Sequence, residues 1–117
     1  MKKTIFCDID GTLVKQHNRG LSHQMLNPPS LLSGTIEKMD EWDRLGYNII
    51  LTTGRKESQR QKTEEYLSNL GIIYDQLVMG IGGGDRVLIN DRKPNSDRDT
   101  AYAISIDRNE GISDVKI

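Results

Sequence analysis

Two carboxylates, Asp8 and Asp10, stand two residues apart where a short apolar run, residues 4–9 (TIFCDI), comes to its end. An unpaired carboxylate inside such a run would be costly to bury, so we expect the pair to reach a solvated edge and to face a cation. Magnesium accepts one or two carboxylates and fills its other positions with water and phosphate oxygens. The pair therefore indicates a Mg²⁺ site that also receives a phosphoryl group.

The two acids suit different chemical roles. An Asp8 held ionised by the metal can attack phosphorus and form an aspartyl-phosphate intermediate. Asp10 can protonate the leaving oxygen and later deprotonate the water that hydrolyses the intermediate. Gly11 allows the tight turn that follows, and Thr12 can cap it. The simpler alternative is an Asp-Gly turn without chemistry.

The elements that must position these acids follow from five short apolar runs, each bounded by Gly, Asp or Asn. The runs cover residues 4–9, 47–53, 74–80, 86–91 and 101–106. Helical patterns lie between the early runs, over residues 33–45 and 57–70, and each ends at a glycine. Strands that alternate with helices indicate βαβ units, and hence an α/β fold with a mainly parallel five-stranded sheet.

Ligands of open parallel sheets bind beyond the carboxyl ends of the strands, so the residues that follow the runs are candidates for the site. Thr53, Gly54 and Arg55 follow the second run, while Asp91 ends the fourth and Lys93 comes two residues later. Thr53 and Lys93 would hold phosphate oxygens, where preorganised donors contribute most, and Gly54 and Arg55 would belong to the same phosphate-binding turn. Asp91 would be a further metal ligand.

Composition limits the classes of function. The 117 residues suit a single domain, residues 1–117, and the net charge of −1 comes from acids and bases mixed along the chain. Without a basic stripe, non-specific binding of nucleic acid is unlikely on this prediction. The single cysteine, Cys7, excludes an internal disulfide and a cysteine-built zinc site. No apolar segment reaches the length of a membrane span, so we expect a cytoplasmic protein.

Two polar stretches interrupt the strand–helix rhythm. Residues 15–30 contain Gly20 and the pair Pro28-Pro29 and are expected to form a long loop or flap. Residues 80–85 (GIGGGD) are expected to form a flexible connector, because they lack the glycine spacing of a phosphate-binding loop.

Three motifs carry a resemblance to a known family. The stretches DIDGT (8–12), TTGR (52–55) and LIND (88–91) resemble the first, second and fourth motifs of the haloacid dehalogenase (HAD) superfamily, in the same order. The resemblance implies a Rossmann-like three-layer sandwich and Mg²⁺-dependent phosphohydrolase chemistry. It also implies that Asp8 is the nucleophile and that Asp10 is the general acid and base, with its backbone carbonyl on Mg²⁺. Thr53 would be the second-motif hydroxyl, and Asp91 the fourth-motif acid.

The chain departs from the superfamily pattern at several positions. Asn90 precedes Asp91 where a second acid is usual, and the next acids are Asp97 and Asp99. Only Arg86 stands before the fourth run, where the third-motif lysine is expected, so we favour Lys93 as the phosphate-binding cation. The chain has no room for a large cap domain, and it most resembles the small, capless sugar-phosphate and capsule-biosynthesis phosphatases.

The predicted function is hydrolysis of a phosphomonoester, with a phosphorylated sugar or related metabolite as the expected substrate. A capless site is open, so a polynucleotide 3′-phosphate is the alternative substrate. Alternatively, the 15–30 flap or a neighbouring subunit of a homo-oligomer would act as a lid. A receiver-like or non-catalytic phosphate-binding module is the remaining alternative.

Overall fold

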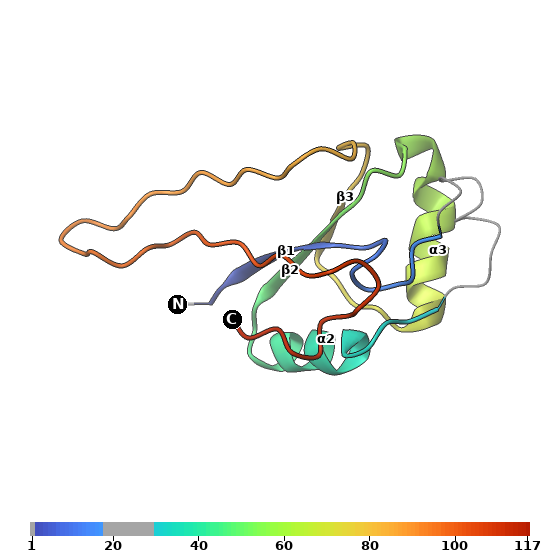
Figure 1. Ribbon diagram of the computed structural model, residues 1–117, viewed down its shortest axis with the longest axis horizontal. Helices are drawn as coiled ribbons and strands as arrows, with labels where there is room; N and C mark the ends of the chain where they lie inside the picture. The colour runs from blue at the N-terminus through green and yellow to red at the C-terminus, as the bar shows by residue number, and fades with distance from the viewer. Residues whose placement is uncertain (1, 18–29) are drawn as a thin grey trace.

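The computed structural model describes residues 2–17 and 30–117 (Figure 1). The elements follow one another in the order β1 (Thr4–Asp8), α2 (Thr35–Arg44), β2 (Asn48–Thr52), η1 (Glu57–Gln59), α3 (Arg60–Leu70) and β3 (Gln76–Val78). Most of the flap expected at 15–30 lies outside the described residues. No helix in the described part of the chain is long and apolar enough to cross a membrane.

The sheet is parallel, with the strands in the order β1-β2-β3. Its register pairs Asp8 with Thr52 and Thr52 with Val78, so the last residues of the three strands lie side by side. α2 connects β1 to β2, and α3 connects β2 to β3, as expected for βαβ units. The predicted α/β fold is therefore confirmed, and the carboxyl edge of the sheet collects the residues that follow β1 and β2.

Each helix buries one narrow face, and a glycine follows within two residues of its end. Met39 and Trp42, three positions apart on α2, are buried, and so are Thr63 and Leu67 on α3. Gly71 ends α3 with φ 77°, and its N–H donates to carbonyl oxygens of the last helical turn. Residues with a side chain are strained in this left-handed conformation, but glycine is not. The glycine in the sequence therefore determines where α3 ends.

The core lies between the sheet and the helices, and the carboxyl-terminal segment helps to close it. Its buried apolar residues are Cys7, Ile9, Leu13, Val14, Met39, Trp42, Ile49, Leu51, Leu67, Ile72, Leu77, Met79 and Ile112. Burying one such aliphatic side chain stabilises the fold by about 1.5–3 kcal/mol. Ile112 also donates its backbone N–H to the Ser33 carbonyl at 2.8 Å, which ties the end of the chain to the start of α2.

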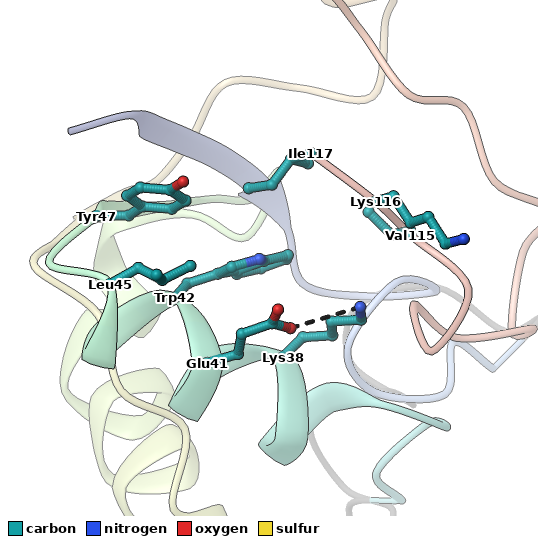
Figure 2. Close-up of a pocket in the computed structure, with 8 residues that line it drawn as sticks. All are labelled: Lys38, Glu41, Trp42, Leu45, Tyr47, Val115, Lys116 and Ile117. Atoms are coloured by element: carbon teal, nitrogen blue, oxygen red, sulfur yellow. Dashed lines mark ion pairs between the residues drawn. The ribbon is translucent and has the colours of Figure 1, made fainter. Parts of the chain in front are cut away.

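A shallow hollow of about 230 Å³ lies where the carboxyl-terminal residues pass α2 (Figure 2). Its lining residues are Lys38, Glu41, Trp42, Leu45, Tyr47, Val115, Lys116 and Ile117. The ion pair between Lys38 Nζ and Glu41 Oε2, at 3.6 Å, runs along its floor. None of these residues follows a strand of the sheet, so this hollow is separate from the carboxyl edge.

The predicted five-stranded sheet is not confirmed, because the sheet of the described residues has three strands. The runs at 86–91 and 101–106 instead lie in a long excursion that leaves the body of the molecule and returns (Figure 1). We call residues 86–105 the arm. Only seven residues, 79–85, separate β3 from the arm, whereas a crossover to a further parallel strand needs about a dozen or more. The two runs form no strand in the structure, and the short connector disfavours a parallel pairing of the first run within the described chain.

Candidate functional site

The carboxyl edge brings together the first two predicted motifs. Asp8 ends β1, and Asp10 lies two residues beyond it. Thr53 follows β2 directly and is buried, with its N–H donating to the Val78 carbonyl at 3.0 Å. Because the strands are parallel and in register, groups that are 45 residues apart in sequence meet at one edge.

The turn after β1 fixes the direction in which Asp8 and Asp10 leave the strand. The Ile9 carbonyl accepts the N–H groups of Leu13 and Val14, at 2.9 and 3.2 Å, and Gly11 donates to the Val14 carbonyl at 2.7 Å. Gly11 has φ 90°, and a Cβ there would lie 3.2 Å from the Arg108 side chain. The DG pair therefore forms a turn, as the simpler alternative proposed, and this turn also presents both acids.

Asp8 is an exposed residue whose carboxylate is only partly balanced by its surroundings. Partial burial of the carboxyl group raises its pKa most, and the charge of Asp10 raises it further. The Ile9 N–H, the Arg86 charge and the Thr12 hydroxyl oppose this shift, the last with Oγ1 3.4 Å from Asp8 Oδ2. A carboxylate with a raised pKa gains from a nearby cation.

The donor set at this edge suits Mg²⁺. The groups present are carboxylate, carbonyl and hydroxyl oxygens, which are the ligands of a hard cation, and the incompletely balanced Asp8 offers it a charge. Within one chain, however, the described residues contain no group of three or more His, Cys, Asp or Glu side chains arranged to hold a metal. The carboxyl edge carries Asp8 and Asp10, and a metal bound there stays a prediction.

Asp10 is held by Arg55 in a two-pronged ion pair. Arg55 Nε donates to Asp10 Oδ2 at 2.9 Å, and Nη2 donates to Oδ1 at 2.8 Å. The Arg55 side chain is fully buried, and that of Asp10 is 13% exposed. Paired donors of this kind fix the plane of a carboxylate as well as its position. The sequence leaves Arg55 to pair either with an acid or with a substrate phosphate, and in the structure its guanidinium faces the acid Asp10.

Helix α3 supports Arg55 from the side opposite Asp10. Arg55 Nη1 lies 3.4 Å from Thr63 Oγ1, and its guanidinium carbon lies 4.7 Å from the centre of the Tyr66 ring. Burial lowers the pKa of Arg55, but the hydrogen bonds and charge of Asp10 outweigh it, and the net shift is upward. The sequence analysis did not identify Thr63 and Tyr66 as residues that support Arg55. The available signal was their spacing of three residues on α3, which places both on one side of the helix.

Thr53 and Gly54 provide the close approach that a phosphate-binding turn needs. Thr53 Oγ1 accepts the Arg55 N–H at 3.1 Å, so its hydroxyl hydrogen can be donated to a ligand. A Cβ on Gly54 would come within 3.1 Å of the Gly82 carbonyl, so glycine lets the 80–85 connector pack against this turn. The Gly80 N–H, bonded to the Arg55 carbonyl at 2.7 Å, fastens the connector there.

The structure separates the two candidate cations. Lys93 is exposed on the arm, where its Nζ pairs with Asp91 Oδ1 at 3.2 Å, and neither residue is brought to Asp8 within one chain. Arg86 lies at the start of the arm, bonded to the Gly82 and Gly84 carbonyls, and its charge acts on Asp8. Lys93 is favoured from the sequence, whereas in the structure the charge of Arg86 acts on Asp8; which of the two binds phosphate stays a prediction.

Cys7 precedes Asp8 but takes no part in this chemistry. Burial, with a smaller contribution from Asp8, raises the pKa of the thiol to about 12. The neutral thiol is a poor nucleophile, and it packs in the core as a small apolar group.

Comparison with known proteins agrees with these motifs. The family model of the polynucleotide kinase PNKP phosphatase domain, a HAD family, matches residues 2–94. No curated protein matches the sequence.

Solved structures share the fold. A structure of the Pnkp1/Rnl/Hen1 complex has a chain 30% identical to this one, with a TM-score of 0.58, over 68% of this chain and 28% of that chain. A structure of the Pnkp1/Rnl/Hen1 RNA repair complex has a chain 28% identical, with a TM-score of 0.57, over 83% of this chain and 27% of that chain. This chain thus spans under a third of those proteins.

A crystal structure from Vibrio cholerae, 22% identical with a TM-score of 0.51 over 75% of this chain and 79% of that chain, shares the fold. The family match covers well over half of the chain and includes all three motifs. The chain therefore belongs to the PNKP phosphatase-domain family of HAD phosphatases.

Proposed function

We propose that this chain hydrolyses phosphomonoesters in a Mg²⁺-dependent reaction in which Asp8 is the nucleophile. The observation that carries the proposal is the arrangement at the carboxyl edge. An exposed carboxylate, Asp8, lies beside a second one, Asp10, whose orientation is fixed by a buried arginine. The membership in a phosphatase family supports the same chemistry.

The two acids divide the reaction between them. An Asp8 oxygen forms a bond to phosphorus while the bond from phosphorus to the ester oxygen breaks, and protonated Asp10 gives its proton to that oxygen. In the second step Asp10 takes a proton from water as the water oxygen attacks phosphorus, which releases phosphate and restores the Asp8 carboxylate. Arg55 holds the Asp10 carboxylate in one plane for both transfers.

Positive charge and hydrogen-bond donors at the edge would bind the phosphoryl oxygens. The Thr53 hydroxyl and the Arg86 guanidinium are the groups that the structure offers for this purpose. Asp8 and the Asp10 backbone oxygen would hold Mg²⁺ with Asp91 as the third ligand, and the bound ion would supply positive charge against the phosphate. Asp91 as the third ligand is a prediction from the sequence.

Two classes of substrate have separate support. The near-neutral charge of the chain favours a small phosphorylated sugar or related metabolite. The match to a polynucleotide kinase phosphatase domain supports a terminal phosphate of a polynucleotide. The sequence-based prediction that nucleic acid is an unlikely partner is therefore not supported by the comparisons.

A phosphate-release screen tests the proposal and separates the substrates. Sugar phosphates, nucleotides and 3′-phosphorylated oligonucleotides are assayed at low salt with Mg²⁺ and with a chelator. We expect release that depends on the metal and falls by at least about 10³-fold in Asp8→Asn, because removing a nucleophile leaves only binding and orientation. Normal turnover by a folded Asp8→Asn variant would contradict the mechanism.

A further inference from the structure

The arm exposes a continuous apolar segment that the described residues leave largely uncovered. Val87, Leu88 and Ile89 are 84%, 54% and 90% exposed. No backbone-to-backbone hydrogen bond between described residues involves positions 82–106. Exposed extended chain of this composition is a template for pairing with another strand. Within the described part of one chain, the arm is therefore an exposed apolar segment whose backbone is not paired with another strand.

The shape of the molecule shows how far the arm leaves the body. The principal extents are 51 × 28 × 26 Å and the radius of gyration is 14.9 Å, whereas a compact domain of this length has about 13 Å. In Figure 1 the two limbs of the arm run past the amino-terminal end of β1 to a tip well beyond the sheet. The limbs are joined near the tip by an ion pair between Arg92 and Asp99 at 2.8 Å.

The connector disfavours pairing of this segment with β1 of its own chain. The connector is fastened at the carboxyl edge through Gly80 and Ile81, and Arg86 acts electrostatically on Asp8 at that same edge. A strand that starts there can run along β1 only in the opposite direction, which carries Asp91 about 17 Å away from Asp8 at a rise of about 3.3 Å per residue. Parallel pairing with β1 would need a connector of a dozen or more residues, and seven are present.

The free edge of β1 offers a matching surface. The strand order β1-β2-β3 leaves one edge of β1 without a ladder to the described residues, and Phe6 on this strand is 55% exposed. The returning limb passes the start of β1, where Lys3 Nζ lies 5.9 Å from the centre of the Tyr102 ring, and forms no backbone hydrogen bond with it. An edge strand and an unpaired apolar strand are thus present in every chain.

We propose that two copies of this chain exchange arms, so that residues 86–91 of one copy pair in parallel with the β1 edge of the other. A parallel strand beside β1 ends where β1 ends, which places Asp91 of one copy beside Asp8 of its partner. The exchange is mutual and closes a symmetric dimer. Its structural part stands on the arm geometry, and its catalytic part, the delivery of Asp91, rests on the proposed function.

The molar mass in solution tests the exchange directly. We expect light scattering after size-exclusion chromatography to give a dimer of the 13.2 kDa chain. The double variant V87D/I89D should be monomeric, because two charges cannot be buried against the partner. Ile36→Asp, on a helix residue 38% exposed, is the matched control and should remain dimeric. A monomeric wild-type chain, or a dimer that survives V87D/I89D, would overturn the proposal.

Lengthening the connector provides a second structural test. Ten Gly/Ser residues inserted between Gly83 and Gly84 allow the strand to fold back onto its own β1, because the connector then exceeds the length of a parallel crossover. We expect this variant to be monomeric and to keep its phosphatase activity. A lengthened variant that stays dimeric would show that the short connector does not drive the exchange.

Mixed variants test whether Asp91 acts across the dimer. Asp8→Asn and Asp91→Asn are each expected to be inactive, and refolding them together should restore roughly a quarter of wild-type activity, since half of the dimers are mixed and each has one complete site. No recovery in isolated mixed dimers would overturn the exchange. If wild-type protein has no phosphatase activity, the proposed function fails, and the molar masses alone decide whether arms exchange.

Discussion

At the scale of the residue, the site depends on how each of two neighbouring acids is balanced. Asp10 has a full partner in buried Arg55, whereas the Ile9 N–H, the Arg86 charge and the Thr12 hydroxyl do not offset the burial of the Asp8 carboxylate. The Asp10 carboxylate is thus fixed in place, whereas the Asp8 carboxylate can react.

Arg55→Met tests the fixed acid. Removing one partner of a largely buried pair is expected to cost about 3 kcal/mol in the free energy of unfolding and to lower kcat more than it raises KM. Arg55→Lys should recover part of the stability but less of kcat, because a lysine cannot hold both oxygens. Urea denaturation and steady-state kinetics measure both effects. Arg44→Lys, at a side chain 72% exposed, is the control and should change neither by more than about 0.5 kcal/mol.

The pH dependence of stability tests the reactive acid. The pKa of Asp8 is raised in the folded chain, so its ionisation opposes folding, and stability is lost as the pH rises from the ordinary value of 3.8 through the raised value. Metal-free Asp8→Asn should therefore have a higher Tm than wild type at pH 7 and the same Tm well below pH 3.8. Added Mg²⁺ should raise the Tm of wild type only. Equal Tm values of metal-free wild type and Asp8→Asn at pH 7 would show that ionisation of Asp8 does not destabilise the fold.

At the scale of the element, positive-φ glycines set where segments stop and how closely they approach. Gly111 and Gly71 have φ 84° and 77°, but a Cβ on Gly111 would lie 2.4 Å from the Ser33 carbonyl oxygen, while Gly71 faces open space. A comparison of the same substitution at the two positions therefore separates the cost of backbone strain from the cost of steric contact.

Alanine substitution at the two glycines measures that contact. Gly71→Ala should cost about 1–2 kcal/mol from the left-handed backbone alone. Gly111→Ala should cost clearly more, because the carboxyl-terminal segment must move away from the start of α2. Urea denaturation of both variants gives the difference, and equal costs would mean that the segment is loosely docked.

The same scale explains what could be predicted from the sequence. The ends of β1 and β2 follow from local composition, so the positions of Asp8, Asp10 and Thr53 at one edge were foreseen. The pairing of Arg55 with Asp10 depends on how two strands lie together, and residue type alone fits phosphate equally well. The strands expected at 86–91 and 101–106 failed because pairing depends on connector length, which propensity does not include.

At the scale of the whole molecule, the chain is a small βαβ body with an arm that forms no backbone-to-backbone hydrogen bond with described residues. Amide protons in such a segment exchange with solvent unless something covers them. The protection of amide protons in the arm therefore measures whether a partner covers it.

Hydrogen exchange followed by mass spectrometry tests this at the level of segments. Peptides covering residues 86–91 should be protected in the wild-type dimer and should exchange at unprotected rates in V87D/I89D. Peptides from α3 should show the same protection in both proteins and serve as the internal reference. Rapid exchange of the arm in wild type would mean that it stays uncovered.

The burial of Cys7 gives the molecule a built-in chemical reporter. Its thiol lies in β1, directly before the nucleophile, and stays protonated while the core is closed. An alkylating reagent therefore labels the chain only when β1 separates from β2 and the core packed against it. Because no other cysteine competes for the reagent, the labelling rate follows the opening of the strand that supports both acids.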